Sequence, residues 1–301
     1  MFDIIIIGGG VAGMTAALYS LRNNKKVLLL EKETIGGQIA KSPKVENYPT
    51  YKEISGSELA DGLFEQISAL GVEFELEKVE TISKDNGIFT VTTDYNNYQA
   101  KSVIIATGAK PRVLGLENED KFIGKGVYYC AICDGPFFAG KEVTLIGDAN
   151  SALQYALMLA SYCSKVHIFT LFDKFFGEQA LQDKVLASPN IIVTHNAQAV
   201  SLLGEDNLES ITFKTADGIL INHKTEAVFV AIGQVPDNKP FEQFASLDKG
   251  GYITAGETCL TQTDGLFVAG DCRTKEVRQV TTAMADGAIA ATAANKYLNS
   301  L

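Results

Sequence analysis

The chain of 301 residues has no long hydrophobic run and no Lys/Arg-rich stretch. Because no stretch of about 18 apolar residues is present, we expect no membrane span. The sequence begins directly with a strand-like segment and has no basic leader, which predicts no secretory signal and a cytoplasmic location. A net charge of −10 without a basic cluster argues against nucleic acid and anionic membrane surfaces as partners.

Cysteine and histidine are also scarce, with five and three residues. Five unevenly spaced cysteines do not form the framework of a disulfide-rich secreted domain. A zinc site built on one C-x-x-C needs a second such pair or a Cys/His partner pair, and neither Cys259 and Cys272 nor the histidines have that spacing. We therefore expect no metal, and we expect Cys163, Cys259 and Cys272 to be small core residues.

Hydrophobic residues and glycine are abundant, at 46% and 27 residues, which is enough core for about two domains. A buried-strand pattern at Phe2 to Ile7 is followed by the glycine loop Gly8 to Gly13. A helix through about Asn23 comes next, and then a second strand that ends at Glu31.

This order is the complete fingerprint of a dinucleotide site. Gly8 allows the tight turn, Gly10 leaves room for a pyrophosphate, and Gly13 lets helix and strand pack closely. Glu31 can accept hydrogen bonds from a ribose diol. The N-terminal segment is therefore predicted to bind an adenine dinucleotide.

A second loop has the same setting but different chemistry. It runs from Gly147 to Ala152, after the strand-like residues 142–146 and before a helical run from Ser151 to Ser161. Ala149 adds a Cβ where the second glycine should be, and Asp148 adds a negative charge beside a potential phosphate. The pattern indicates a former nucleotide site.

Two similar strands, at 102–109 and 227–233, follow the two glycine loops at matching places. The C-terminal segment supplies a strand ending in Gly270-Asp271 and an Ala-rich helix from about Thr281 to Tyr297, which complete the first half. We therefore predict an α/β fold of two Rossmann-like three-layer domains, with the second inserted into the first. The expected bounds are 1–112 plus 244–301 for the first domain and 113–243 for the second.

One cysteine pair stands apart, because Cys130-Ala131-Ile132-Cys133 has the spacing of a small redox-active disulfide ring. Asp134 follows at once and is a natural proton donor to a leaving thiolate. The alternative is that Asp134 only caps the next helix.

Together these motifs resemble the low-molecular-weight thioredoxin reductases over essentially the whole chain. The resemblance depends on the following segments: Gly8 to Gly13, Gly36-Gly37-Gln38, Glu46-Asn47-Tyr48-Pro49, Ala106-Thr107-Gly108, Cys130 to Gly135, Gly270-Asp271 and Arg278-Gln279. It implies a flavoprotein with FAD in the discontinuous domain, the C-x-x-C on the inserted NAD(P)-binding-like domain, thioredoxin as partner, and a homodimer.

The resemblance also implies roles for individual residues. Cys133 is expected to face the flavin, and Cys130 is expected to be the exchange thiol toward thioredoxin. The expected FAD-binding residues are Gly8, Gly10, Val11, Ala12, Gly13, Glu31, Gly37, Gln38, Asn47, Ala106, Thr107, Gly108, Gly270, Asp271, Arg278, Gln279 and Val280.

The chain departs from the family where NADPH-using members carry cations for the adenosine 2′-phosphate. After the strand at 165–169, those positions hold Thr, Leu or Phe, and Lys174 cannot replace an arginine fork. A switch to NADH would leave the phosphate loop intact, whereas here the loop has changed too. Asp173 could serve as a ribose-binding acid, but it lies several residues beyond the expected strand end.

We therefore expect an FAD-dependent thioredoxin-disulfide reductase that receives electrons from reduced ferredoxin, similar to the subfamily that does not use pyridine nucleotides. Two alternatives stay open: an NAD(P)H-dependent enzyme with an unusual nucleotide site, and a flavin-disulfide redox sensor that does not turn over. Docking of an acidic ferredoxin needs a basic surface, for which Arg273, Lys275 and Arg278 are candidates.

Overall fold

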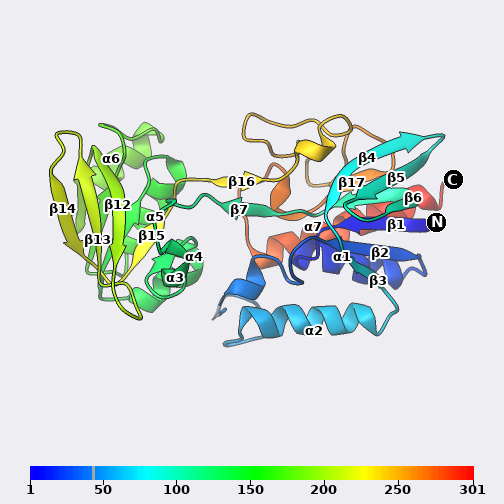
Figure 1. Ribbon diagram of the computed structural model, residues 1–301, viewed down its shortest axis with the longest axis horizontal. Helices are drawn as coiled ribbons and strands as arrows, with labels where there is room; N and C mark the ends of the chain where they lie inside the picture. The colour runs from blue at the N-terminus through cyan, green and yellow to red at the C-terminus, as the bar shows by residue number, and fades with distance from the viewer. Residues whose placement is uncertain (43–44) are drawn as a thin grey trace. The chain divides into compact units, whose positions relative to one another are not determined.

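The computed structural model describes residues 1–42 and 45–301, and these form two compact units (Figure 1). Unit 1 comprises Met1–Lys110 and Val235–Leu301, and unit 2 comprises Pro111–Gln234. The second unit is therefore an insertion in the first. The predicted fold class, α/β with two Rossmann-like layered units, is confirmed.

The sheet of unit 1 is centred on β1 (Phe2–Ile7), an isoleucine-rich strand buried on both faces. β1 pairs in parallel with β2 (Val27–Glu31) and with β6 (Asn97–Ile105), and β2 pairs with β3 (Glu73–Leu76). The second half of β6 pairs in parallel with β17 (Leu266–Val268), while its first half begins an antiparallel meander. That meander continues through β5 (Ile88–Thr93) and β4 (Val79–Asp85).

Alternate residues of β1 face two different layers, as the period of a strand requires. Ile4 and Ile6 pack in the cluster that includes α1 (Val11–Leu21), α2 (Gly56–Ser68) and α7 (Val280–Leu298). Ile5 and Ile7 pack on the other face with residues of the meander. A Cβ on Gly287 would lie 2.2 Å from the Ala12 carbonyl oxygen, so α7 approaches α1 closely through its small residues.

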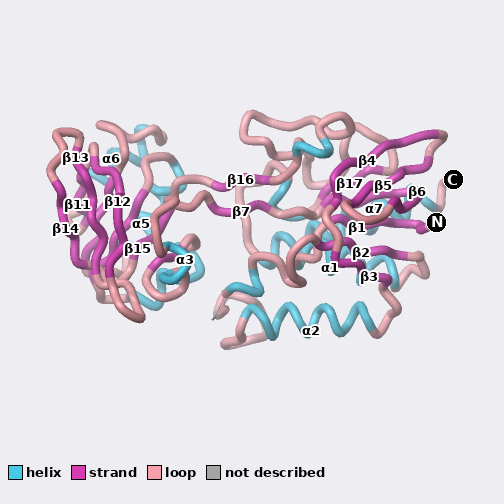
Figure 2. The backbone as a smooth tube through the Cα atoms, viewed as in Figure 1, coloured by secondary structure: helices cyan, strands magenta, loops and turns pink. Residues whose placement is uncertain are grey.

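Unit 2 repeats the parallel arrangement (Figure 2), in the strand order β11-β10-β9-β15-β8. One face is covered by α5 (Asn150–Ala160) and α6 (Gln179–Ala187), and the other packs against a three-stranded meander. The strands are β8 (Val127–Tyr128), β9 (Glu142–Ile146), β10 (Lys165–Phe169), β11 (Ile191–Thr194) and β15 (Val228–Val230) in the sheet, and β12 (Ala197–Leu203), β13 (Ser210–Thr215) and β14 (Leu220–Lys224) in the meander.

Short elements complete the chain. The segments that cross between the units contain β7 (Ala109–Pro111) and β16 (Gln234–Pro236), which pair with each other. The remaining short helices are η1 (Ile39–Lys41), α3 (Glu119–Phe122), α4 (Ala131–Asp134), η2 (Gly135–Phe138), η3 (Lys239–Phe241) and η4 (Gly270–Cys272). In the part of the chain that the structure describes, no helix combines the length and the apolar character needed to cross a bilayer.

Candidate functional site

The first glycine loop joins β1 to α1 and is tightly packed except at one position. A Cβ on Gly8, which has φ of +115°, would lie 2.3 Å from the Ala106 carbonyl oxygen, and a Cβ on Gly13 would lie 1.9 Å from the Gly8 carbonyl oxygen. At Gly10 the nearest atom is 4.0 Å away. The loop therefore leaves space beside Gly10, where a pyrophosphate is expected to bind.

The beginning of α1 faces this space. Gly10 is its N-cap and supplies no side chain, so the amides of the first turn, at Val11, Ala12 and Gly13, have no side-chain cap. A helix N-terminus with unpaired amides and a positive dipole end is a natural binding site for phosphate. The geometry thus fits a dinucleotide.

Glu31 ends β2 next to the same loop. Its carboxylate accepts hydrogen bonds from the backbone amides of Gly9 (2.7 Å) and Glu33 (2.8 Å). These bonds fix the carboxylate, and its remaining lone pairs can accept from a ribose diol.

The turn at Gly36-Gly37-Gln38 lies against the glycine loop. The Gly36 amide donates to the Gly9 carbonyl (2.9 Å), and a Cβ on Gly37 would lie 3.4 Å from the Gly10 Cα. Gln38 is exposed and is the N-cap of η1.

Asn47 and Gln279 lie 232 residues apart in sequence but are in contact. The Asn47 side-chain amide donates to the Gln279 side-chain oxygen over 3.1 Å. Gln279 is the N-cap of α7, in a capping box with Thr282, and Val280 begins the helix. The structure therefore brings together two residues that the resemblance alone had linked to FAD.

The turn at Ala106-Thr107-Gly108 follows β6 at the same end of the sheet, and the Ala106 amide donates to the Ile7 carbonyl (2.7 Å). The Thr107 hydroxyl donates to the side chain of Asn238 (3.2 Å). At Gly108, with φ of +69°, a Cβ would have no neighbour within 4 Å. This turn therefore has a fixed backbone and an open side.

Asp271 gives the strongest test of whether the residues fit the dinucleotide. Its Oδ1 atom is buried and has no hydrogen-bond partner among the described residues. Burial raises the pKa of this carboxyl, and the nearby charges of Lys275 and Arg278 oppose that shift. An unsatisfied buried oxygen is rare in a native protein. Its position after the Gly270 turn fits a hydrogen bond to a bound dinucleotide.

Arg278 lies beside this turn. Its guanidinium is 4.3 Å from the ring centroid of Tyr252, and its Nε donates to the Asp271 carbonyl over 3.4 Å. The side chain is partly buried and held by its neighbours. It therefore helps shape the segment that carries Asp271.

The proposed role of Arg273 and Lys275 in docking is wrong. Arg273 is only 8% exposed and forms a two-point ion pair with Asp286 (2.8 and 2.7 Å), and the Lys275 ammonium pairs with the same carboxylate (2.9 Å). Asp286 also accepts from the Gly270 amide (3.0 Å). Because burial of charge requires such pairing, these cations stabilise the Gly270 turn and are not available to a partner.

Asp286 was not expected from the sequence. The sequence signal that could have found it is that Asp286 is a lone acid in an otherwise Ala-rich helix.

The redox pair lies in unit 2, where Cys130 and Cys133 form a disulfide with a Cα–Cα distance of 5.2 Å. Cys130 is the N-cap of α4, and its sulfur accepts a hydrogen bond from the Cys133 amide (3.2 Å). Both cysteines are partly exposed. An amide donor favours a thiolate, so after reduction this contact stabilises the charged form of Cys130.

Asp134 ends α4 immediately after the pair. Burial raises the pKa of its carboxyl to about 6. Its side chain makes no capping hydrogen bond to the following η2, so the alternative role as a helix cap is not observed. A carboxyl with a pKa near the working pH suits proton donation to a leaving thiolate.

We expect thioredoxin reduction to depend on the protonation of Asp134. Because the pKa of its carboxyl is raised, the folded protein favours the neutral acid. The fraction of Asp134 that can donate a proton, and the stability gained from its neutral form, are therefore both lost as the pH rises through about 6. In single-turnover oxidation of the reduced dithiol by thioredoxin, the wild-type rate should fall above that pH. In Asp134→Asn the rate should be slower and lack that inflection. An unchanged inflection in the variant would exclude this role.

The second glycine loop keeps the backbone of a nucleotide loop but not its chemistry. Gly147 has φ of +151°, and a Cβ there would lie 2.5 Å from the Ala231 carbonyl oxygen, so the tight turn is present. Ala149 is the exposed N-cap of α5. Burial raises the pKa of Asp148, as expected for a carboxylate held against the loop without a counter-charge.

The chain's own residues contact the start of α5. The Phe176 amide donates to the Asp148 carbonyl (2.7 Å), and the Glu178 amide donates to the Asn150 side chain (2.7 Å). The Asn150 amide in turn donates to the Glu178 carboxylate (3.2 Å). This carboxylate adds a second negative group beside the loop.

After β10, the positions where no cation was expected hold apolar side chains or a hydroxyl that is already hydrogen-bonded. Thr170 is fully buried, and its hydroxyl lies 2.7 Å from both the Phe172 carbonyl and His195 Nδ1. The side chains that follow are about half exposed, at 54% for Leu171, 49% for Phe172 and 56% for Phe176. Lys174 Nζ lies 5.6 Å from the Phe176 ring centroid.

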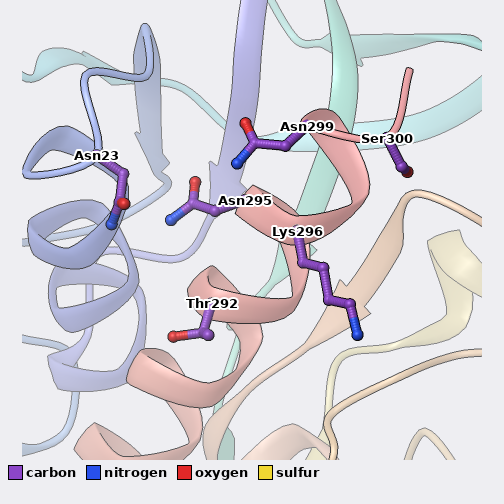
Figure 3. Close-up of a pocket in the computed structure, with 6 residues that line it drawn as sticks. All are labelled: Asn23, Thr292, Asn295, Lys296, Asn299 and Ser300. Atoms are coloured by element: carbon purple, nitrogen blue, oxygen red, sulfur yellow. The ribbon is translucent and has the colours of Figure 1, made fainter.

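The pocket in Figure 3 is separate from these loops. It has a volume of about 350 Å³ and is lined by Asn23, after α1, by Thr292, Asn295 and Lys296 in the last turns of α7, and by Asn299 and Ser300, which follow that helix. Asn23 lies at the opposite end of α1 from the glycine loop, so about 16 Å of helix separates the two. None of these residues was predicted to bind the cofactor.

The three other cysteines, Cys163, Cys259 and Cys272, are free and buried, which confirms their predicted place in the core. Among residues 1–42 and 45–301, no group of three or more His, Cys, Asp or Glu side chains is arranged to hold a metal ion.

Comparison with known proteins agrees with this geometry. A model of the pyridine nucleotide-disulphide oxidoreductase family matches residues 2–287. The thioredoxin reductase of Treponema pallidum is 39% identical over 302 residues, covering 100% of this chain and 98% of that protein. A 34.2 kDa protein in the rubredoxin operon of Clostridium pasteurianum is 36% identical over 301 residues, covering 98% and 97%. The crystal structure of thioredoxin reductase from Streptococcus pyogenes matches with a TM-score of 0.95 at 36% identity, covering 100% and 99%.

The fold and the two glycine loops, with a disulfide on the inserted unit, define a flavoprotein disulfide oxidoreductase. Within that class, the chain belongs to the low-molecular-weight thioredoxin reductases. Its cofactor is FAD, as in the rest of the family.

Proposed function

We propose that this thioredoxin reductase takes its electrons from reduced ferredoxin and not from NADPH or NADH. Unit 1 would hold FAD, through the residues that surround the Gly10 space and the Asp271 carboxylate. Unit 2 would serve to carry Cys130 and Cys133 to thioredoxin.

The chemistry at the start of α5 is the observation that carries this proposal. A pyrophosphate there would meet the carboxylates of Asp148 and Glu178. The amides at the start of α1 and of α5 alike have no side-chain cap. The loops differ because the negative charges of Asp148 and Glu178 oppose a second anion, and because Ala149 stands at the position where Gly10 leaves open space in the first loop. The two loops therefore differ in the negative charge and the free space that a phosphate would meet.

The apolar side chains that follow β10 support the same conclusion. Leu171, Phe172 and Phe176 offer no hydrogen bonds to a 2′-phosphate. If a charge-assisted hydrogen bond contributes about 1.5–3 kcal/mol, the loss of two corresponds to about 3–6 kcal/mol. That loss weakens binding on the order of a hundredfold to ten-thousandfold.

FAD can accept electrons singly from an iron–sulfur donor and pass two of them to a disulfide. In the proposed exchange, the Cys130 thiolate attacks the thioredoxin disulfide and forms a mixed disulfide, with one thioredoxin sulfur leaving as a thiolate. Asp134 gives that thiolate its proton. The Cys133 thiol then attacks the Cys130 sulfur and its proton passes to the second thioredoxin sulfur, which restores the Cys130–Cys133 disulfide and releases thioredoxin as a dithiol.

Anaerobic photometry of the FAD-loaded protein tests the proposal. Reduced ferredoxin should bleach the flavin absorbance within the time of one turnover, and millimolar NADPH or NADH should not. Dithionite serves as the control that the bound flavin is reducible. Rapid bleaching by NADPH or NADH would restore the ordinary pyridine-nucleotide enzyme.

Turnover distinguishes the enzyme from the redox sensor. With ferredoxin as donor, catalytic amounts of protein should reduce many equivalents of thioredoxin. Stoichiometric oxidation of the dithiol followed by arrest would instead support the sensor. We further propose a cytoplasmic homodimer, whose assembly is measured by sedimentation of the FAD-loaded protein.

A further inference from the structure

A buried carboxylate in unit 2 is hydrogen-bonded to Tyr129, the residue that precedes Cys130 of the redox pair. Glu119 is only 4% exposed. Its two oxygens accept hydrogen bonds from the backbone amides of Leu114 (2.9 Å), Gly115 (2.8 Å) and Leu116 (3.3 Å). A buried acid is stable only when it is hydrogen-bonded in this way, so the contacts keep Glu119 in one place.

The same carboxylate accepts a short hydrogen bond from the Tyr129 hydroxyl, over 2.5 Å. Burial is the main cause that raises the pKa of this phenol, and the hydrogen bond to Glu119 adds to it, so the tyrosine stays a donor. The ring is also packed against the apolar cluster that contains Phe122 and Val127. Tyr129 is thus held both by its ring and by its hydroxyl.

Tyr129 links the end of a strand to the redox pair. β8 ends at Tyr128, and Cys130 is already the N-cap of α4, whose sulfur accepts the Cys133 amide. Tyr129 is therefore the single residue between the sheet and the exchange sulfur. Any freedom of its backbone changes where Cys130 lies relative to that amide.

We infer that Glu119 is a positioning residue for thiol–disulfide exchange, which acts through the Tyr129 hydroxyl to hold the Cys130 sulfur against the Cys133 amide. The Tyr129 hydroxyl donates to Glu119, and Glu119 accepts otherwise from the backbone amides at 114–116. Their effect on the reaction is to maintain the one hydrogen bond that favours the Cys130 thiolate. This inference rests on the proposed role of Cys130 as the exchange thiol.

The reactivity of a lone Cys130 thiol provides the test. In Cys133→Ser the backbone amide at position 133 is retained, and the other three cysteines are buried. The rate of alkylation by iodoacetamide, followed against pH and assigned to Cys130 by peptide mass, reports its thiolate fraction. Adding Tyr129→Phe should move the midpoint of this profile upward and slow the reaction at neutral pH by about threefold to tenfold.

A second tyrosine provides a matched control. Tyr98 in unit 1 donates to the buried carboxylate of Glu77 over 3.1 Å, so Tyr98→Phe removes the same kind of hydrogen bond elsewhere. On the Cys133→Ser background it should leave the alkylation profile unchanged. If Tyr129→Phe loses its native thermal transition, Glu119→Asp takes its place in the test. This variant keeps the charge but shortens the reach of the carboxylate, and it should raise the midpoint of the alkylation profile in the same way.

A profile for Tyr129→Phe that coincides with that of Cys133→Ser alone, in protein with a normal thermal transition, would overturn the inference. Failure of the proposed function has a different signature. If thioredoxin is trapped on Cys133 in Cys130→Ser, and not on Cys130 in Cys133→Ser, the exchange assignment is wrong whatever the alkylation profile shows.

Discussion

Cys130→Ser and Cys133→Ser should each abolish steady-state reduction of thioredoxin while FAD stays bound. The disulfide joins two sulfurs within α4 and its N-cap, and only a pair of thiols can resolve a mixed disulfide with the partner. A serine hydroxyl has no accessible thiolate-like state, so Cys130→Ser has no nucleophile for the first step and Cys133→Ser has none for the second. The measurement is thioredoxin reduction with excess electron donor, alongside the flavin spectrum.

The two variants should differ in what they trap. Cys133→Ser leaves a free Cys130 whose sulfur still faces the amide at position 133, so it should form a stable mixed disulfide with thioredoxin. Cys163→Ser is the matched control, because Cys163 is buried in the same unit and its sulfur contacts the Phe138 carbonyl at 3.3 Å. Turnover above about a tenth of the native rate in either active-site variant would contradict the assignment of the dithiol.

Local sequence patterns were sufficient for the first dinucleotide loop. The glycine spacing from Gly8 to Gly13 and the acid at Glu31 are separated by one strand–helix–strand unit, so their proximity follows from the fold class. The same reasoning identified the altered loop at Asp148 and Ala149, because the chemistry of a phosphate loop is encoded in adjacent residues. The spacing of Cys130 and Cys133 likewise predicted a disulfide, which the structure contains.

Contacts between distant segments could not be predicted in this way. The hydrogen bond from Asn47 to Gln279 joins residues that no local pattern connects, and only the family resemblance placed both of them near FAD. Arg273 and Lys275 looked like surface cations, because a sequence does not show that Asp286 of α7 buries both in ion pairs. Glu119 was missed for a different reason: its partners are near in sequence, but most of them are backbone amides, which leave no signal in the residue types.

The second prediction with a large effect is that Gly10→Val will be colourless, or nearly so. Gly10 has φ of −75°, a conformation that any residue adopts, and a Cβ there would meet no protein atom closer than 4.0 Å. The folded chain therefore tolerates the side chain, with a loss on the order of 1 kcal/mol at the N-cap position. The branched methyl groups would instead fill the space in front of the uncapped amides of α1, where we expect the pyrophosphate to bind.

Two substitutions frame this result. Gly62→Val lies within α2, where a Cβ would also meet nothing within 4 Å, and it should keep its full complement of FAD. Gly13→Val should fail to fold, because its Cβ would lie 1.9 Å from the Gly8 carbonyl oxygen.

For Gly10→Val, far-ultraviolet circular dichroism and the thermal transition establish folding, and titration of the apoprotein with FAD measures affinity. A folded Gly10→Val protein that purifies yellow with one FAD per chain would show that the pyrophosphate binds elsewhere. A folded but colourless protein would show that cofactor binding needs the open space at Gly10 in front of α1, a position that Ala149 holds in the second loop.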